Sequence, residues 1–323
     1  MNIPPADISI IICSKDRRDS LKKLVDRLRA IPSARTTEIV VVEETGEPAS
    51  LEGVTYVFHP VAGRGIPFAR NLGLQHATGD IVVFIDDDCS IHESWLENLL
   101  ALFNDGSVVG VQGGVTVADS TNPIGWAESI LGFPGGGVQR ILSAENHNQQ
   151  TREVSTLNCA YRKWVLDKIG GFDDRLKFGG EDYVLAKQAC RYGKCFFVPD
   201  ARVTHAARGG LLPVFKWFVR RGRADIDVIR ISRQTDRTFF SLFKDAITVK
   251  LLIAALLGIL MPRFAALVIT AFIIGYSTLQ YFRYYKVWKR SAAPLSALVG
   301  IPTVKLVMDI GMDWGRIRRI LFE

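Results

Sequence analysis

Three consecutive carboxylates, Asp86-Asp87-Asp88, are the strongest chemical signal in this chain. They directly follow the apolar run 81–85, which is typical of a buried strand. Ligands commonly bind at the carboxyl ends of strands in α/β sheets, and three adjacent acids there repel one another unless a cation lies among them. An acidic turn that caps the next helix needs only one acid. The triplet therefore favours a divalent-metal site over a simple cap.

Further polar side chains follow the other predicted strands. The apolar run 7–12 leads to Ser14 and Asp16, the run 39–42 ends at Glu43, and Arg70 lies near the start of a helix predicted from Pro67. Each of these residues alone fits a turn or a helix cap. Together at one sheet edge they describe a sugar-nucleotide pocket, with acids for the base and ribose, an arginine for phosphate and a metal for the diphosphate.

The order of the predicted elements indicates an α/β fold. Strands over 7–12, 39–42, 55–58 and 81–85 alternate with helices and read as continuously apolar, which is typical of a mostly parallel sheet flanked by helices on both faces. Residues 119–156 are polar and are predicted as a long loop, either a substrate lid or a disordered segment. The chain contains no Gly-x-x-x-x-Gly-Lys-Ser/Thr motif, which excludes a P-loop.

The composition of the chain bears on its disulfide content, its secretion and its binding partners. Its five cysteines include no Cys-x-x-Cys pair, which argues against a disulfide framework or a zinc site, and no secretory signal is expected at the N-terminus. The net charge of +7 is concentrated in two basic stretches that flank the most apolar segment. This pattern favours membrane lipids as partners and does not favour nucleic acid.

Five motifs in a fixed order resemble the family 2 glycosyltransferases over residues 7–225. They are, in chain order, Ala69-Arg70-Asn71-Leu72-Gly73, residues 79–88, Gly170-Gly171-Phe172-Asp173, Gly180-Glu181-Asp182 and Val203-Thr204-His205. The resemblance implies a GT-A-like fold, a nucleotide-diphosphate sugar donor, Mg²⁺ or Mn²⁺ as cofactor, and inversion at the anomeric carbon. It also implies synthesis of a cell-envelope polysaccharide or a glycolipid by a membrane-anchored enzyme of bacterial type.

The resemblance also assigns expected roles to individual residues. Asp88, Asp86 and His205 are expected at the metal, with Asp86 also near the ribose. Asp182, beside Glu181, is the expected catalytic base. Without the resemblance, these two acids would be read as serving the dipole of their helix, and a lone histidine that ends a strand is usually structural.

Other expected contacts concern the donor and the acceptor. The expected donor-binding residues are Ser14, Asp16, Glu43, Arg70 and Asp86. Candidates on the acceptor side or at the diphosphate are Asn158, Arg220 and Arg221.

The C-terminal part has a different character from the rest. We predict a catalytic domain over 1–210, a basic amphipathic interfacial segment over 211–240 and a membrane region over 241–323. Two apolar helices, about 246–261 and 264–282, are each close to the roughly 20 residues that span a bilayer and form a hairpin at Pro262. Residues 295–312 are predicted as an interfacial or re-entrant helix. A surface helix packed on the sheet is the alternative for 211–240.

These patterns predict a metal-dependent, inverting glycosyltransferase at the cytoplasmic face of the membrane, since basic residues flank both ends of the hairpin. The predicted acceptor is lipid-linked or a polysaccharide. One alternative is a nucleotidyltransferase, which needs a glycine-bearing phosphate-activating signature near the first strand. The other is a catalytically silent membrane protein that binds nucleotide-sugars, against which Asp88, Asp182 and His205 count.

Overall fold

The computed structural model describes residues 7–31, 35–48, 50–60, 63–232, 238–243 and 246–323. The chain forms two compact units. The first comprises Met1–Ala118 and Ala144–Ala206, and the second comprises Asp119–Ser143 and Ala207–Glu323. Residues 119–143 thus belong with the C-terminal unit, although the division we predict places them in the domain 1–210. That division into three domains stays a proposal.

The first unit is built on a mixed sheet of nine strands in the order β3-β2-β1-β4-β8-β6-β9-β5, with β7 paired to β9. Its first four strands are parallel and match the predicted ones: β1 (Ile8–Lys15), β2 (Thr37–Thr45), β3 (Thr55–Pro60) and β4 (Ile81–Asp86). Their parallel pairing brings the carboxyl ends of β1, β2 and β4 to one edge of the sheet.

The other half of the sheet contains most of the antiparallel pairs. β8 (Asn158–Arg162) runs antiparallel to β4 and to β6 (Val108–Thr116), whereas β9 (Lys194–His205) is parallel to β6. The short strands β5 (Cys89–Ile91) and β7 (Gln149–Thr151) run antiparallel to β9. β6 is one continuous strand whose register with β9 is irregular between Val108 and Gly110 and between Gly113 and Val115.

Helices cover both faces of this sheet, as the apolar strands require. On one face, Ile10 and Val83 belong to a core that includes Leu24 of α1 (Arg18–Ala30) and Leu99 of α3 (Trp95–Leu100). On the other, Phe84 packs in a core with residues of α6 (Lys163–Ile169) and α7 (Glu181–Ala189). Successive strand residues alternate between the two cores because side chains along a strand point to opposite faces. Helix α2 (Ile66–His76) contacts β1 and β2.

The second unit is helical in its described residues. Its elements are α4 (Pro123–Ile130), α5 (Gly137–Ser143), α8 (Leu211–Ile231), α9 (Phe239–Phe243), α10 (Ile247–Leu260), the 3₁₀ turn η2 (Pro262–Phe264), α11 (Ala265–Arg290) and α12 (Leu295–Leu321). The prediction of a loose loop over 119–156 is wrong, since this segment contains α4, α5 and β7. Asn122 caps α4 by accepting a hydrogen bond from the Gly125 amide at 2.9 Å.

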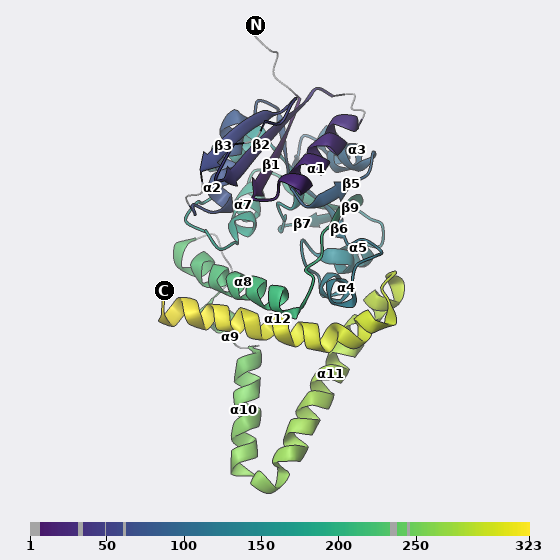
Figure 1. Ribbon diagram of the computed structural model, residues 1–323, viewed down its shortest axis with the longest axis vertical. Helices are drawn as coiled ribbons and strands as arrows, with labels where there is room; N and C mark the ends of the chain where they lie inside the picture. Colours follow the sequence, from purple (N-terminus) through teal and green to yellow (C-terminus); the bar gives the residue numbers. More distant parts are fainter. Residues whose placement is uncertain (1–6, 32–34, 49, 61–62, 233–237, 244–245) are drawn as a thin grey trace. The chain divides into compact units, whose positions relative to one another are not determined.

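Helices α8 and α12 lie side by side in this unit (Figure 1). Glycines allow the close approach: a Cβ on Gly222 would lie 2.0 Å from the Met312 carbonyl oxygen, and one on Gly315 would lie 2.0 Å from that of Val219. Phe218 and Ile226, apolar residues within the predicted interfacial segment, are 2% and 0% exposed. Part of the apolar surface of that segment is therefore covered within the second unit.

The apolar hairpin is present as α10 and α11, joined by η2 at the predicted proline (Figure 1). Among the described residues, two helical segments are long and apolar enough to cross a membrane, Pro262–Arg290 and Leu295–Leu321. By the same measure, α10 is a shorter apolar helix. Helix α12 continues to Leu321 with Pro302 inside it, beyond the end predicted at residue 312.

Candidate functional site

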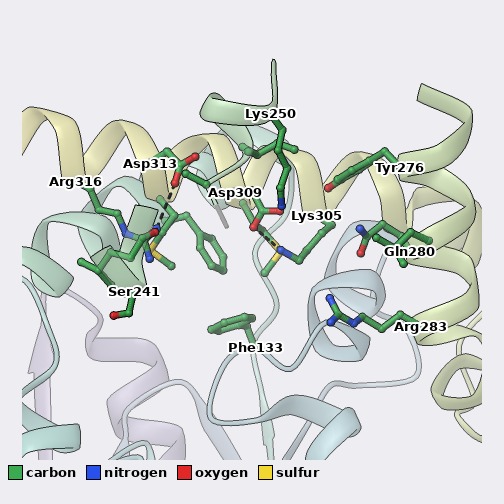
Figure 2. Close-up of a pocket in the computed structure, with 17 residues that line it drawn as sticks. Phe133, Ser241, Lys250, Tyr276, Gln280, Arg283, Lys305, Asp309, Asp313 and Arg316 are labelled. Carbon is green, nitrogen blue, oxygen red and sulfur yellow. Dashed lines mark hydrogen bonds and ion pairs between the residues drawn. The ribbon is translucent and has the colours of Figure 1, made fainter. Parts of the chain in front are cut away.

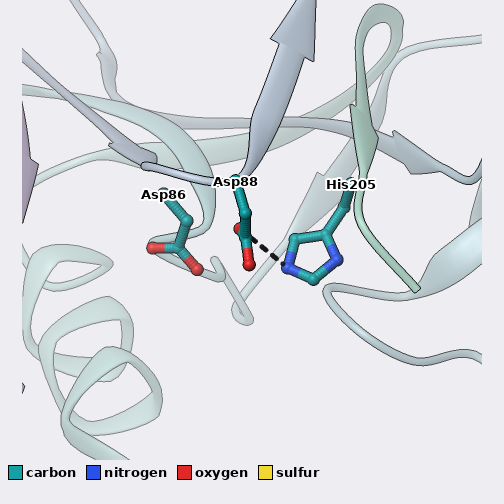
Figure 3. Close-up of side chains that lie close together, drawn as sticks. All are labelled: Asp86, Asp88 and His205. Carbon is teal, nitrogen blue, oxygen red and sulfur yellow. Dashed lines mark ion pairs between the residues drawn. The ribbon is translucent and has the colours of Figure 1, made fainter. Parts of the chain in front are cut away.

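The metal-site candidates meet because two strands pair. Asp86 ends β4, and Asp88 precedes Cys89, the first residue of β5. Cys89 pairs with His205, the last residue of β9. This register places Asp88 beside His205, with 3.2 Å between Oδ1 of the acid and Nε2 of the imidazole (Figure 3). Residues more than a hundred positions apart in the sequence thus form one group.

Asp86, Asp88 and His205 offer ligand atoms that all lie within 4.8 Å of one another. Oδ1 of Asp88 is buried and, among the residues that the structure describes, has no hydrogen-bond partner. Two carboxylates and one imidazole form a donor set that can hold a divalent cation. The residues present therefore fit a divalent cation, as the sequence predicts.

Arg17, which the sequence analysis did not single out, balances part of this acidic group. Its guanidinium lies 2.5 Å from Asp88 and 2.9 Å from Asp87. Burial alone would raise the pKa of Asp88, but the neighbouring His205 and Arg17 lower it below its ordinary value. Asp88 is therefore held as a carboxylate, the form that binds a cation.

Asp87, the middle acid, lies away from solvent. It is 1% exposed and accepts a hydrogen bond of 2.7 Å from Oγ of Ser14. Burial raises the pKa of Asp87 to about 6, although Ser14 and Arg17 act in the opposite direction. Ser14, predicted to contact the donor, thus holds the turn that carries the metal ligands. Its own donor contact stays a prediction.

Arg70 connects Asp86, one of the candidate metal ligands, to the predicted catalytic acids at the start of α7. One guanidinium nitrogen lies 2.6 Å from Glu181 and the other 3.5 Å from Asp86. Burial would lower the pKa of Arg70, but the charges of Glu181 and Asp86 raise it above its ordinary value. Asp182 follows Glu181 in the first turn of α7, and its Oδ1 accepts a 2.8 Å hydrogen bond from the Tyr183 amide. The strand-end acids and the N-terminus of α7 are therefore joined through one buried cation.

Two predicted donor contacts lie at neighbouring strand ends. Glu43 on β2 pairs in register with Ser14 on β1, is fully buried, and accepts hydrogen bonds from Tyr56 and Arg18. Asp16 is exposed at the end of β1 with a φ of 53°, a conformation that aspartate tolerates better than most residues. Their contacts with a nucleotide stay predictions.

The acceptor-side candidates are Asn158 in the first unit and Arg220 and Arg221 in the second. Asn158 is fully buried, donates to the carbonyls of Gly114 and Ala201, and accepts from Nε1 of Trp95. Its side chain joins strands and offers no surface to an acceptor. Arg220 and Arg221 belong to α8 in the second unit, where Arg221 lies over the Phe133 and Trp217 rings. A role for these arginines at the diphosphate stays a prediction.

A mixed α/β sheet in which one strand ends in Asp-x-Asp beside a histidine is the arrangement expected of a GT-A-like glycosyltransferase. A family model described as Glycosyl transferase family 2 matches residues 9–170, half of the chain. The chain therefore belongs to glycosyl transferase family 2, as the sequence motifs predicted.

Curated relatives are similar at a modest level. Over 225 residues, 67% of this chain, it is 27% identical to "Pre-mycofactocin glycosyltransferase" of Mycobacterium tuberculosis, of which this match covers 45%. It is 24% identical over 195 residues to "Glucosyl-dolichyl phosphate glucuronosyltransferase" of Haloferax volcanii, covering 56% of this chain and 61% of that one. The chain thus spans less than two thirds of each of these relatives. "Glycosyltransferase AglE" of the same organism is 26% identical over 250 residues, 73% of this chain and 78% of that one.

A solved structure confirms the fold. "Mannosyltransferase PcManGT from Pyrobaculum calidifontis in complex with GDP-Man and Mn2+" superposes with a TM-score of 0.56, at 16% identity, over 98% of this chain and 88% of that one. The predicted GT-A-like fold is therefore confirmed.

Proposed function

We propose that this protein transfers a sugar from a nucleotide-diphosphate donor to a hydroxyl group of an acceptor. The observation that supports this most is the group Asp86, Asp88 and His205 in a chain of this family, linked through Arg70 to the acids that start α7. Mannosyltransferase PcManGT, similar in fold, was solved with GDP-Man and Mn²⁺. We extend a nucleotide-sugar and a divalent metal to this chain.

The proposed mechanism is a single in-line displacement with inversion. A divalent cation held by Asp86, Asp88 and His205 would supply Lewis-acid stabilisation of the leaving diphosphate. Asp182 removes the proton of the acceptor hydroxyl as its oxygen attacks the anomeric carbon. Arg70 fixes Glu181 next to that base, so its contribution is to position the start of α7. A displacement of this kind needs no nucleophilic side chain on the enzyme.

We further propose a lipid-linked acceptor and a location at the cytoplasmic face of the membrane. The hairpin exposes large apolar side chains, including Leu252 at 69% and Phe282 at 86%, as expected of lipid contact. Basic residues occupy the C-terminal turns of α11, which favours a cytoplasmic end under the positive-inside rule. The Haloferax volcanii relative is named for a dolichyl phosphate substrate, which supports the same acceptor class.

A thermal-shift panel of nucleoside diphosphates, with and without Mn²⁺, tests the donor site. The matching nucleotide raises the melting temperature only when Mn²⁺ is present, since ligands stabilise the folded state by mass action. In Asp88→Asn this increment is lost, whereas an exposed control, Lys22→Asn, retains it. Stabilisation that is the same in Asp88→Asn, or none with any nucleotide, contradicts the proposed site.

A further inference from the structure

The second unit contains a cavity of about 560 Å³ at the place where α10 and α11 meet α12 (Figure 2). A volume of this size is in the range of small-ligand pockets. Its walls combine apolar side chains with four basic and two acidic ones: Lys250, Arg283, Lys305, Arg316, Asp309 and Asp313. An apolar core does not require such charges, so each of them needs an explanation.

Part of this charge belongs to the framework. Arg316 pairs with Asp225 and Asp313 and donates to the Leu242 carbonyl, while Asp313 accepts from the Thr248 amide and hydroxyl at 3.0 Å each. These bonds tie α8, α10 and α12 together. Lys305 forms an ion pair with Asp309 one turn further along α12. Both acids of the wall are therefore already engaged with cations or backbone amides.

Two polar residues of α11 that line the cavity take no part in these ion pairs and hydrogen bonds. Gln280 is 4% exposed, lines the cavity, and its Oε1 has no hydrogen-bond partner in the described part of the chain. Arg283, three residues later on the same helix face, is exposed and forms no ion pair with any described residue, so its guanidinium is available to a ligand. Buried polar groups normally find partners. Oε1 of Gln280 is an acceptor and needs a donor. A ligand that donates to this oxygen, as the hydroxyl of a singly protonated phosphate monoester does, and that accepts from Arg283 would engage both side chains.

The cavity also borders on apolar surface. Leu279, which lines it, is 55% exposed, and Phe282, beside Arg283, is 86% exposed. The apolar helix α10 begins there, and Lys250 in its first turns adds positive charge to the wall. A guanidinium together with an apolar border suits an amphiphile whose anionic head enters the cavity and whose chain follows the hairpin. A free inorganic anion has no apolar part that could contact this border.

We propose that this cavity binds the phosphate headgroup of a membrane lipid, with Arg283 and Gln280 as its contacts. Binding of a lipid phosphate at this cavity does not depend on the proposed catalytic activity. The additional proposal that the bound lipid is the sugar acceptor rests on the proposed function.

The test uses full-length protein in an uncharged maltoside detergent, with dodecyl phosphate, dodecanol and inorganic phosphate as probes. Of these three probes, only dodecyl phosphate is expected to raise the melting temperature in a saturable way. In Arg283→Gln its apparent affinity falls about tenfold, the size expected for one lost charge-assisted contact. Lys286→Gln is the matched control, because Lys286 is an exposed cation on the same helix outside the cavity wall. Gln280→Leu weakens binding without a change of charge.

If dodecanol raises the melting temperature as much as dodecyl phosphate does, the cavity is only an apolar crevice. If inorganic phosphate does so, the cavity is a site for free anions. Either result overturns the proposal, as does equal loss of affinity in Arg283→Gln and Lys286→Gln. The nucleotide panel on the same preparation separates this failure from failure of the proposed function, because its probes address Asp88 in the first unit.

Discussion

At the scale of single residues, Arg70 connects the two halves of the candidate site. Its guanidinium is 7% exposed and bridges Glu181 and Asp86, which come from α7 and β4. A buried cation of this kind fixes geometry more than it adds stability, because the ion pair is offset by the desolvation of both partners. When one partner is removed, the other remains buried without compensation, which is strongly destabilising.

Arg70→Gln is therefore expected to lower the free energy of unfolding by about 3 kcal/mol, measured by chemical denaturation. The double variant Arg70→Gln with Glu181→Gln recovers part of this loss, since the uncompensated carboxylate is gone. Lys22→Gln, which breaks an exposed ion pair with Asp26, changes stability by less than about 0.5 kcal/mol and is the control. Equal effects of the Arg70 and Lys22 substitutions would contradict a buried bridge.

The residues that could be predicted were those whose position follows from strand order. Asp86 and Asp88 end a recognisable apolar run, so their place at the sheet edge followed from the sequence. Arg17 was missed because its pairing with Asp87 and Asp88 depends on how the turn after β4 packs against the end of β1. The acceptor-side role of Asn158 stays a prediction; that its side-chain amide bonds to residues of other elements could not be foreseen, because these bonds depend on strand pairing.

At the scale of elements, the pair α8 and α12 depends on backbone contact. Gly222, Gly311 and Gly315 leave no room for a methyl group against the facing helix. Small residues at a helix interface let the backbones approach, so this pair gains contact that larger side chains would prevent. The sequence predicted both helices but not their pairing, because helical periodicity identifies an apolar face without identifying what covers it.

Gly315→Ala is expected to lower the free energy of unfolding by about 2 kcal/mol, because its Cβ would lie 2.0 Å from the Val219 carbonyl oxygen and force the helices apart. Gly300→Ala on the same helix meets nothing within 4 Å and should stabilise the protein by about 0.5–1 kcal/mol through helix propensity. Melting temperatures in detergent distinguish the two. A neutral Gly315→Ala would show that α8 and α12 do not pack this closely.

The segment 119–156 shows where prediction at this scale failed. Its glycines and polar residues suggested a loop, yet α4 and α5 form there. Asn122 followed by Pro123 is a helix-start signal that the sequence did offer. The other cause of helix formation here is tertiary packing, which the sequence does not reveal: Ala127 and Ile130 of α4 are buried among residues of α8 and α12.

At the scale of the whole molecule, apolar exposure is concentrated in the hairpin. The 18-residue window within Pro262–Arg290 is only 6% buried, whereas the first unit buries its apolar strands on both faces. Exposure on this scale indicates contact with lipid or with another protein. The proposed membrane anchor follows from this difference.

Leu267→Lys combined with Ile274→Lys, at positions 65% and 61% exposed, is expected to release the protein from membranes. Each lysine near the centre of a bilayer costs about 3 kcal/mol. Flotation with phosphatidylcholine vesicles measures the bound fraction. Tyr192→Lys, an exposed aromatic position in the first unit, should float like the unmodified chain. Unchanged flotation of the double variant would mean that the hairpin is not the anchor.

The central claim is metal-dependent sugar transfer with Asp182 as the base, and one comparison addresses it most directly. Purified protein is incubated with a radiolabelled nucleotide-sugar that the thermal-shift panel selects, Mn²⁺ and membrane lipid extract, and transfer of label to lipid is counted. The account predicts Mn²⁺-dependent transfer that Asp182→Asn reduces by at least about a hundredfold, while the nucleotide still raises its melting temperature. Transfer by Asp182→Asn at the rate of the unmodified protein would contradict the account.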